Sequence, residues 1–352
     1  MSAMSVEARG AWLVEVGARG PLGLNSLQLA TAARARKMEA RESALLDKHE
    51  RSVGSVRARF LPDELFGLER LVQLGAPALR EAGRSLLAPV PLVVGIAEAE
   101  RPDVGAAVEA ELLPRLIRAG EIAVDEARSL TVRGGQASFV MALEAGLGLL
   151  AQGAPAVLVG CVDSLVHPDA VAWLDAGHRL HADLTEDGII PSEAAAFALL
   201  VPGGAIDARL FRAAAPSPLA ALRWARSARD ESVLDPDGPI VAEVLTGLVH
   251  GGLGTLSAPP AWLMTDLDEM HRVREWSRVE LRSYPVFERA QHDRVPDLFG
   301  DVGAATGALA AAYACRSWSL GGAPGGALLV ALAADGPPRG VFVLEDAVEG
   351  LR

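Results

Sequence analysis

Short apolar runs alternate with stretches of helical spacing along most of the chain. Ala11–Ala18, Pro91–Ala97 and Pro155–Leu165 have the length and apolar continuity of strands covered on both faces. Gln136–Ala151 is rich in alanine and leucine and ends at a Gly-Ala-Pro sequence, which makes it the strongest helix prediction in the chain. This half therefore predicts buried strands packed between helices.

The other elements of this half follow the same alternation. Helices are expected in a stretch ending at Ala35, from about Glu64 to Ala82, and from Val104 to Ala119. Strands are expected in SLTVRG from Ser129 and AAAFALLVP from Ala194. Residues 36–59 are highly charged without a clear period, which indicates an exposed excursion.

The pattern restarts after residues 203–237, an Ala-, Pro- and Arg-rich stretch that predicts a linker. Beyond it we expect strands in PIVAEVLTGL, AWLMTDL, GALLVALAA and GVFVLED, beginning at Pro239, Ala261, Gly326 and Gly340, and a helix over Gly303–Trp318. Two successive halves, 1–205 and 206–352, fused into one globular unit, predict an α/β architecture with helices on both sheet faces.

Composition agrees with a globular chain. Of 352 residues, 50% are hydrophobic but only 5% aromatic, and the mean hydropathy is +0.25, so the core is built mainly from Ala, Val and Leu. A chain of this length buries enough surface to fold without disulfides or metals. The N-terminus lacks the layout of a signal peptide, and the longest uncharged stretches are broken by glycine and proline, so no membrane span is expected.

Charge and cysteine content narrow the partners and the compartment. Lys plus Arg is 33 against 45 for Asp plus Glu, a net charge of −12 that repels nucleic acid and anionic membranes. Cys161 and Cys315 are a single possible pair, which fits a reducing cytoplasm better than a secreted, disulfide-stabilised fold. A cytoplasmic protein without nucleic-acid or membrane partners is expected.

Several motifs occur in the order and spacing of one known family. VGARGPLGLN, VLVGCVDSL with GHRLHADLTEDGIIPSEAAAFALL, and SLGGAPGGALLV together resemble a β-ketoacyl synthase of the thiolase superfamily, from about Ala11 to Asp346. Ile189 and Ser192 replace a Phe and a Gly of the family signature. The resemblance implies a thiolase-like fold with duplicated α-β-α-β-α layers, a role in fatty acid or polyketide biosynthesis, and dimerisation through sheet edges.

The expected nucleophile is missing. In active ketosynthases a Cys lies at the N-terminus of a buried helix, whose dipole favours the thiolate. The segment RGGQASFVMAL resembles that site but places Gln136 at the Cys position. Cys161 is no substitute because it lies inside a predicted core strand, where a small buried side chain is the simpler interpretation.

Both family histidines are also replaced. In LMTDLDEMHRVREW, Asp266 or Asp268 lies nearest the first, and in PDLFGDVGAATGAL, Asp301 takes the second while Pro296 takes a family Lys. The histidines of the family donate hydrogen bonds to the thioester oxygen and stabilise the enolate. Ionised carboxylates only accept hydrogen bonds and repel both malonate and enolate, so condensation and decarboxylation are not expected.

Four other polar features predict no metal and no cofactor. His178 and His181 lack a third ligand, and HGGLGT from His250 lacks the Lys of a phosphate loop and is expected to be a turn. Asp266, Asp268 and Glu269 are expected to form a solvated acidic loop, and His271 to face solvent on a helix.

Two functions stay open. The first is a non-enzymatic partner, scaffold or adaptor, homodimeric or heterodimeric, which pairs with an active ketosynthase as chain-length factors do, with acyl carrier protein as a further partner, or serves an assembly such as a bacterial secretion system. The second is an acyltransferase or malonyl decarboxylase that uses Asp301 and Asp266 as acid and base. In either case Gln136 is expected beside Asp301, and Phe139 or Met141 filling the pocket would favour the scaffold.

Overall fold

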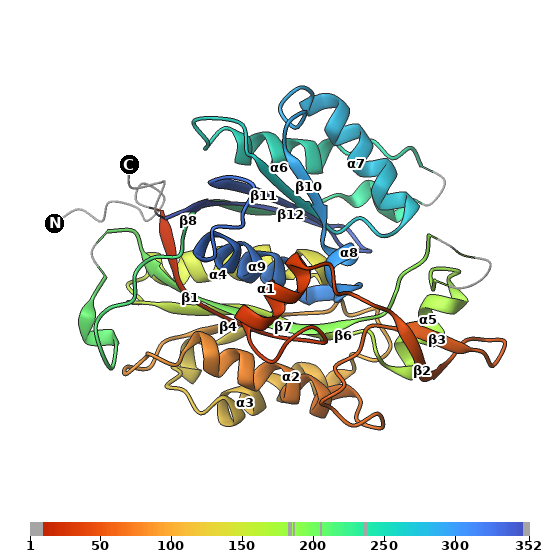
Figure 1. Cartoon of the computed structure of the whole chain (residues 1–352), viewed down its shortest axis with the longest axis horizontal. Helices are drawn as coiled ribbons and strands as arrows, with labels where there is room; N and C mark the ends of the chain where they lie inside the picture. Colours follow the sequence, from red (N-terminus) through yellow and green to blue (C-terminus); the bar gives the residue numbers. More distant parts are fainter. Residues whose placement is uncertain (1–9, 182–184, 186, 205, 236–237, 348–352) are drawn as a thin grey trace.

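The computed structural model describes residues 10–347 except 182–184, 186, 205 and 236–237 (Figure 1). Its main sheet has ten strands in the order β10-β9-β11-β12-β8-β1-β7-β6-β4-β5. Strand β1 (Ala11–Arg19) pairs antiparallel with β7 along its length and with β8 over three residues at its start, which joins the two halves of the sheet.

The elements up to residue 202 build the first half. In chain order they are β1, α1 (Ser26–Arg34), β2 (Arg41–Leu46), β3 (Ser52–Ser55), α2 (Gly67–Ala82), β4 (Leu92–Ile96), α3 (Ala106–Gly120), η2 (Glu126–Arg128), β5 (Leu130–Arg133), η3 (Gly135–Ala137), α4 (Ser138–Ala151), β6 (Val157–Ser164), α5 (Pro168–Ala176) and β7 (Glu193–Pro202).

The remaining elements build the second half. They are η4 (Ala208–Leu210), β8 (Ala220–Arg229), η5 (Glu231–Leu234), α6 (Glu243–Leu253), β9 (Trp262–Thr265), α7 (Met270–Ser283), β10 (Gln291–Arg294), α8 (Val295–Phe299), η6 (Gly303–Ala305), α9 (Thr306–Ser319), β11 (Ala327–Ala333) and β12 (Pro338–Asp346). The predicted division between residues 205 and 206 falls between β7 and β8, the strands that flank β1.

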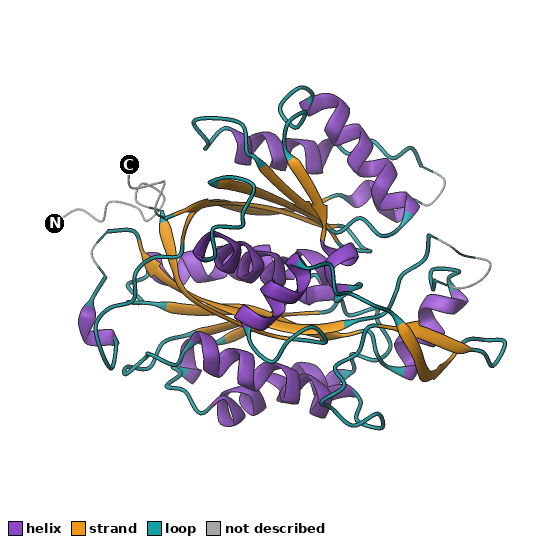
Figure 2. Cartoon of the chain, in the orientation of Figure 1, coloured by secondary structure: helices purple, strands orange, loops and turns teal. Residues whose placement is uncertain are grey.

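Five layers stack across the molecule (Figures 1 and 2). Helices α2 and α3 cover one face of the first half-sheet, α4 and α9 lie between the half-sheets, and α6 and α7 cover the outer face of the second half-sheet. The apolar residues between the half-sheets form the largest buried cluster. No helix among the described residues has the length and apolar content that crossing a membrane requires.

The central helices are buried because their sequences are apolar on every side. In α9 every residue from Thr306 to Cys315 is buried, and small side chains let it lie close to its neighbours. A Cβ on Gly307 would lie 2.7 Å from Leu332 and 2.9 Å from Phe139, so glycine allows α9 to approach both β11 and α4. The first turns of α4 and α9 are thereby fixed inside the molecule.

Three sequence predictions about elements are wrong. The expected linker contains strand β8, whose arginines at 223, 226 and 229 are exposed while Ala220, Ala221, Leu222 and Ala225 are buried. The expected strand from Pro239 is helix α6, and His250 lies in the last turns of this helix and not in a turn. All three errors came from local composition, which tertiary packing overrides.

The charged excursion at residues 36–59 contains a separate hairpin. Strands β2 and β3 pair with each other and not with the main sheet, and they lie beside α5 at one end of the molecule (Figure 1). Its apolar residues Leu45 and Val53 pack with residues of α5 in a small cluster of their own. The hairpin is anchored to the body at Val56, which bridges to Ser192.

Candidate functional site

The first turns of the two central helices meet the carboxyl ends of parallel strands. Strand β4 runs parallel to β5 and β6, and β9 runs parallel to β10 and β11. In open α/β sheets, ligands bind at the carboxyl ends of parallel strands. Here those ends carry Glu98, Asp163, Asp266 and Asp335, after β4, in β6, after β9 and after β11.

A glycine in the left-handed region begins the turn before each central helix. Gly135 has φ +53° and Gly303 has φ +54°. A Cβ on Gly135 would lie 2.6 Å from Oε2 of Glu98, and a Cβ on Gly303 would lie 2.1 Å from Oδ2 of Asp163. Each turn is thus approached closely by one carboxylate, and only glycine leaves room for it.

Arg101 is the buried cation of the first half. Its Nη1 and Nη2 donate to both oxygens of Asp163 at 2.8 and 2.6 Å, and its Nε and Nη2 donate to Asp103 at 2.9 and 2.8 Å. Asp163 also accepts a hydrogen bond from the backbone N–H of Ala304, at 2.7 Å. Every charge of this centre therefore has close hydrogen-bond partners.

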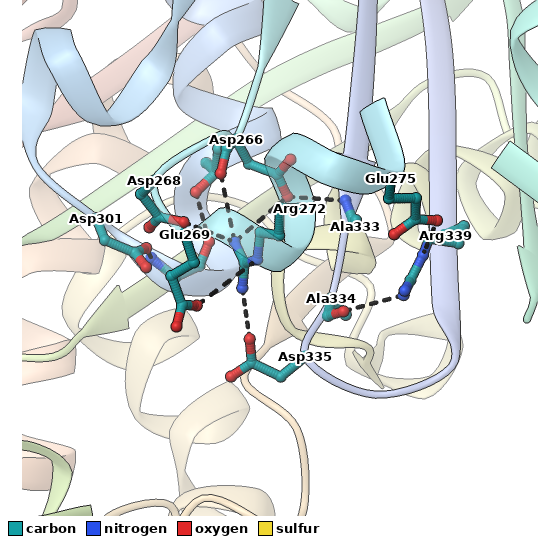
Figure 3. Close-up of polar contacts among 12 residues, drawn as sticks. Asp266, Asp268, Glu269, Arg272, Glu275, Asp301, Ala333, Ala334, Asp335 and Arg339 are labelled. Atoms are coloured by element: carbon teal, nitrogen blue, oxygen red, sulfur yellow. Dashed lines mark hydrogen bonds and ion pairs between the residues drawn. The ribbon is translucent and has the colours of Figure 1, made fainter. Parts of the chain in front are cut away.

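Arg272 is the buried cation of the second half, and its side chain is 1% exposed (Figure 3). It lies at the centre of a ring of carboxylates. Its Nη2 donates to Asp335, while its Nη1 lies 3.5 Å from Asp268 and 3.6 Å from Asp266, and its Nε lies 3.9 Å from Glu269. Only the contact with Asp335 is a close one, so this centre is less completely paired than that of Arg101.

Gln136 contacts this ring through Arg272. With its amide oriented so that oxygen faces donors, Oε1 accepts from Nη2 and Nη1 of Arg272 at 2.9 and 3.2 Å. Gln136 is 4% exposed and lies in η3, directly before α4. The side chain predicted at the nucleophile position is therefore held by a guanidinium inside the protein.

Asp268 and Asp301 are neighbouring carboxyls on one side of Arg272 (Figure 3). One oxygen of Asp301 accepts from the N–H of Gly303 at 2.7 Å, whereas its second oxygen and both oxygens of Asp268 are buried without a donor. Burial, and then the nearby Asp301, raise the pKa of Asp268 well above its usual range despite Arg272. A proton on Asp268 supplies a donor between the two carboxyls.

The excess of acid continues around Arg272. Five carboxyls (Asp266, Asp268, Glu269, Asp301 and Asp335) surround two guanidiniums, Arg272 and Arg179. Burial raises the pKa of Asp266 to about 6, although Arg272 opposes this. Burial raises the pKa of Asp335 as well, but Arg272 and Arg179 together hold it below its usual value.

Glu98 belongs to both centres. Burial raises its pKa to about 7, Arg101 opposes the rise, and the negative charges of Asp335 and Asp163 add to it. The site therefore offers protonated carboxyls near neutral pH and no thiol among the side chains that surround Arg101 and Arg272. Such groups can hold or donate a proton and cannot form a thioester.

The structure brings Asp266, Asp268 and Asp301 into one cluster and links Gln136 to it through Arg272. The prediction of a solvated acidic loop is wrong: Asp266 is 2% and Glu269 6% exposed, because Arg272 and Arg179 neutralise them inside the protein. His271 is exposed on α7, as expected.

Neither cysteine has the setting of a nucleophile. Both thiols are free and completely buried. Burial raises the pKa of Cys161 well above its usual range and that of Cys315 to about 12. Cys161 lies within β6, in agreement with its predicted place in a core strand.

Apolar side chains fill the space around η3. Phe139 is completely buried and packs edge-to-face on Phe342, with ring centroids 5.5 Å apart. Met141 lies so close to Gly134 that a Cβ there would be 2.4 Å from its sulfur. Of four surface cavities of about 560, 410, 240 and 200 Å³, none is lined by Gln136, Asp268 or Asp301.

One group of side chains within the described residues has metal-ligand spacing. Ligand atoms of Glu269, His271 and Asp335 lie within 4.8 Å of one another. However, Arg179 donates to both oxygens of Glu269 at 2.8 and 2.7 Å and to Asp335 at 2.8 Å. The guanidinium already supplies the positive charge that a cation would bring, so this group does not fit a metal site.

Sequence reasoning missed the cations of the site. Arg101 lies outside every quoted motif, and Arg179 and Arg272 lie inside quoted motifs without having been assigned a role. The spacing of Asp268 and Arg272, four residues apart at the start of a helix, was the one available signal for the second centre. The contacts of Arg179 and Asp335 join segments 156 residues apart, which no local pattern reports.

Comparison with solved structures identifies the fold. A structure described as the ishigamide ketosynthase/chain length factor matches with a TM-score of 0.69 and 17% identity, covering 96% of this chain and 99% of that one. The complex AntDE:AntF, a type II polyketide acyl-carrier protein with its ketosynthase, matches with a TM-score of 0.74 and 12% identity over 96% and 99%.

A ketosynthase from module 6 of the bacillaene synthase of Bacillus subtilis 168 gives a TM-score of 0.71 at 13% identity, covering 96% of this chain and 72% of that one. No protein-family model matches the sequence, and no curated protein is similar to it. The predicted thiolase-like fold of β-ketoacyl synthases is thus confirmed.

Proposed function

We propose that this chain is a catalytically degenerate ketosynthase-like subunit that acts through a protein partner, as a chain-length factor, scaffold or adaptor does. The observation that carries the proposal is the state of Gln136. Its amide is buried and bonded to Arg272, at the position where the family resemblance places a nucleophile. An amide in this setting cannot accept an acyl group from a thioester.

The surrounding charges support the same conclusion. Asp266, Asp268 and Asp301 lie at or next to the positions where the resemblance places histidines, and none of them offers an imidazole. An ionised carboxylate only accepts hydrogen bonds, and the carboxyl of Asp268, whose pKa is raised, lies against Asp301. Five carboxyls around two guanidiniums also repel the carboxylate of a malonyl group. The site stabilises the junction of the two halves and opposes the family reaction.

An exposed sheet edge supports assembly. Strand β5 is the last strand of the main sheet and pairs only with β4 among the described strands. It includes Leu130, which is 37% exposed, whereas the opposite edge strand β10 consists of Gln, His, Asp and Arg. An apolar edge strand is a template for pairing with another chain, so β5 is the proposed dimerisation edge.

Photo-crosslinking tests this edge. A photoreactive amino acid at Leu130 is compared with the same amino acid at Leu281, an exposed leucine on α7, in cells that make the protein naturally. The proposal predicts a defined adduct at Leu130 alone, to a second copy, a ketosynthase-type chain or another assembly protein identified by mass spectrometry. Equal labelling at both positions, or none at Leu130, contradicts assembly through β5.

An enzyme acting on acyl thioesters, an acyltransferase or decarboxylase with altered residues, is the second candidate. The observation in its favour is the raised pKa of Asp266, about 6, and of Asp268, which would let a carboxyl donate a proton near neutral pH. Turnover of a malonyl or acetyl thioester that Asp266→Asn and Asp301→Asn abolish would establish it. Both variants retain the size of the side chain.

A further inference from the structure

A small cavity between the β2–β3 hairpin and the corner after β1 carries the opposite charge to the rest of the protein. Its volume is about 200 Å³, and four of its lining side chains are cations: Lys37, Arg41, Arg57 and Arg59. Glu39 is the one acid in its lining. The cavity therefore has an excess of three positive charges in a chain whose net charge is −12.

Two of these cations have no ion-pair partner within the part of the chain that the structure describes. Among the described residues, Lys37 and Arg59 form no ion pair, and both are exposed to solvent. Arg41 is paired with Glu39 at 2.7 Å, and Arg57 with Asp63. An anion entering the cavity would thus meet two free cations and two whose partners are themselves more than half exposed.

Two buried polar atoms of the lining also have no partner. Ser55 is 1% exposed, and its Oγ forms no hydrogen bond within the described residues. The Nε of Arg57 is buried and equally unpaired. Buried hydroxyl and guanidinium groups almost always have a partner, so two unpartnered groups on residues that line one cationic cavity point to an acceptor bound there.

We propose that this cavity binds a phosphate monoester through its phosphoryl group. A phosphate monoester carries a charge of about −1.5 to −2 and three acceptor oxygens, which match one hydroxyl, one guanidinium N–H and the free cations. Guanidiniums favour phosphate oxygens because of their planar, multiple donors. A monocarboxylate offers only two oxygens and one charge and leaves the site partly unsatisfied.

The cavity is joined directly to the acidic cluster. Val56, also in the lining, donates its N–H to the oxygen of Pro191 at 2.9 Å, and its own oxygen accepts from Oγ of Ser192 at 2.9 Å. The N–H of Ser192 donates to the oxygen of Asp301 at 2.8 Å. A ligand that stabilises residues 55–59 therefore also stabilises the backbone that holds Asp301.

Calorimetric titration at low ionic strength tests the proposal, with inorganic phosphate, glycerol phosphate and acetate as separate ligands. Arg59→Gln and Ser55→Ala are expected to weaken phosphate binding by about tenfold each. Ser55→Ala removes a hydroxyl that has no hydrogen-bond partner among the residues the structure describes, so its effect reports the ligand and not the fold. Arg278→Gln, on exposed α7, removes the same charge elsewhere and is expected to change nothing.

Hydrogen exchange provides the second readout. Phosphate is expected to slow exchange at the amides of Val56 and Ser192 in the native protein and not in Arg59→Gln. Binding by both inorganic phosphate and glycerol phosphate assigns the site to the phosphoryl group, and binding by the ester alone assigns it to the ester. The proposal is overturned if neither phosphate binds saturably, if acetate binds as tightly, or if Arg278→Gln weakens binding as much as Arg59→Gln.

Discussion

The two buried arginines of the site are surrounded differently. Arg101 forms four hydrogen bonds to two carboxylates, one of which also accepts from the turn before α9. Arg272 has more carboxylates near it, but most lie 3.5 Å or farther away, and three carboxyl oxygens of Asp268 and Asp301 lack donors. The first centre is a fully hydrogen-bonded ion pair. The second keeps carboxyl oxygens without donors at the positions where the family resemblance places catalytic groups.

The largest expected effect comes from removing the complete centre. Arg101→Met leaves Asp163 and Asp103 buried without their cation, and breaking a buried pair in this way costs about 3–5 kcal/mol. Urea unfolding at pH 7 measures the loss. Arg209→Met, at a side chain that is 90% exposed, is the control and is expected to stay within about 0.5 kcal/mol of the parent. A loss below about 1 kcal/mol for Arg101→Met would contradict the role of this centre.

The turns that begin at Gly303 and Gly135 are expected to lose different amounts of stability when the glycine is replaced by alanine. Gly303→Ala places a Cβ 2.1 Å from the Asp163 carboxylate that Arg101 holds in place, so a loss of about 2–3 kcal/mol is expected. Gly135→Ala meets Glu98 at 2.6 Å, but Glu98 is partly exposed and can move, which limits the loss to about 1 kcal/mol. Thermal unfolding of both variants checks the order, and equal losses would show that the two turns are equally rigid.

Removing one carboxylate from each centre is expected to change the stability of the protein in opposite directions. Asp268→Asn removes an acid that lacks a donor and supplies an N–H to Asp301, so it should stabilise the protein by about 1 kcal/mol at pH 8. Because the folded-state pKa of Asp268 is raised, the parent loses stability as pH rises, and the gain from the variant should vanish near pH 4. Asp163→Asn weakens a paired acid and should lower the melting temperature. The same sign in both variants would remove the distinction between the centres.

The last expected effect is gradual and is the pH dependence of the parent protein. Burial raises the pKa of Glu98 to about 7 in the folded state from its usual 4.5, so the stability linked to its proton is complete below pH 4.5 and lost as pH rises through 7. Unfolding free energy is expected to fall by about 2 kcal/mol between pH 5 and pH 8. Glu98→Gln should flatten this slope, and an unchanged slope would assign it to other groups such as Asp266, with its pKa of about 6.

Most of the fold could be predicted because its central elements are unusually apolar. Strands such as β6, with all eight residues buried, and helix α4 leave a continuous apolar signal in the sequence. Strand β8 was missed because arginine and alanine dominate its composition, and it becomes a strand only between β1 and β12. The helix α6 was missed because an apolar run of strand length has no unambiguous local period.

The candidate site could be predicted only in part. The positions of Gln136, Asp266, Asp268 and Asp301 follow from motif alignment, and the structure brings them together around Arg272, to which the sequence assigned no role. Asp266, Asp268 and Glu269 were expected in a solvated loop, because acids close together in sequence are usually exposed. Their burial depends on Arg179 and Asp335, which only the folded chain brings to them. Partners distant in the sequence thus decide whether an acidic loop is solvated or buried.

The most direct test of the central claim is mass spectrometry of the intact protein and its reaction mixture after incubation with acetyl and malonyl thioesters. The account predicts no acyl adduct on the chain and no turnover above that of the thioester alone, because a buried amide held by Arg272 takes the nucleophile's place. An acyl adduct, or turnover that Asp301→Asn or Asp266→Asn abolishes, would contradict it and establish the chain as an enzyme.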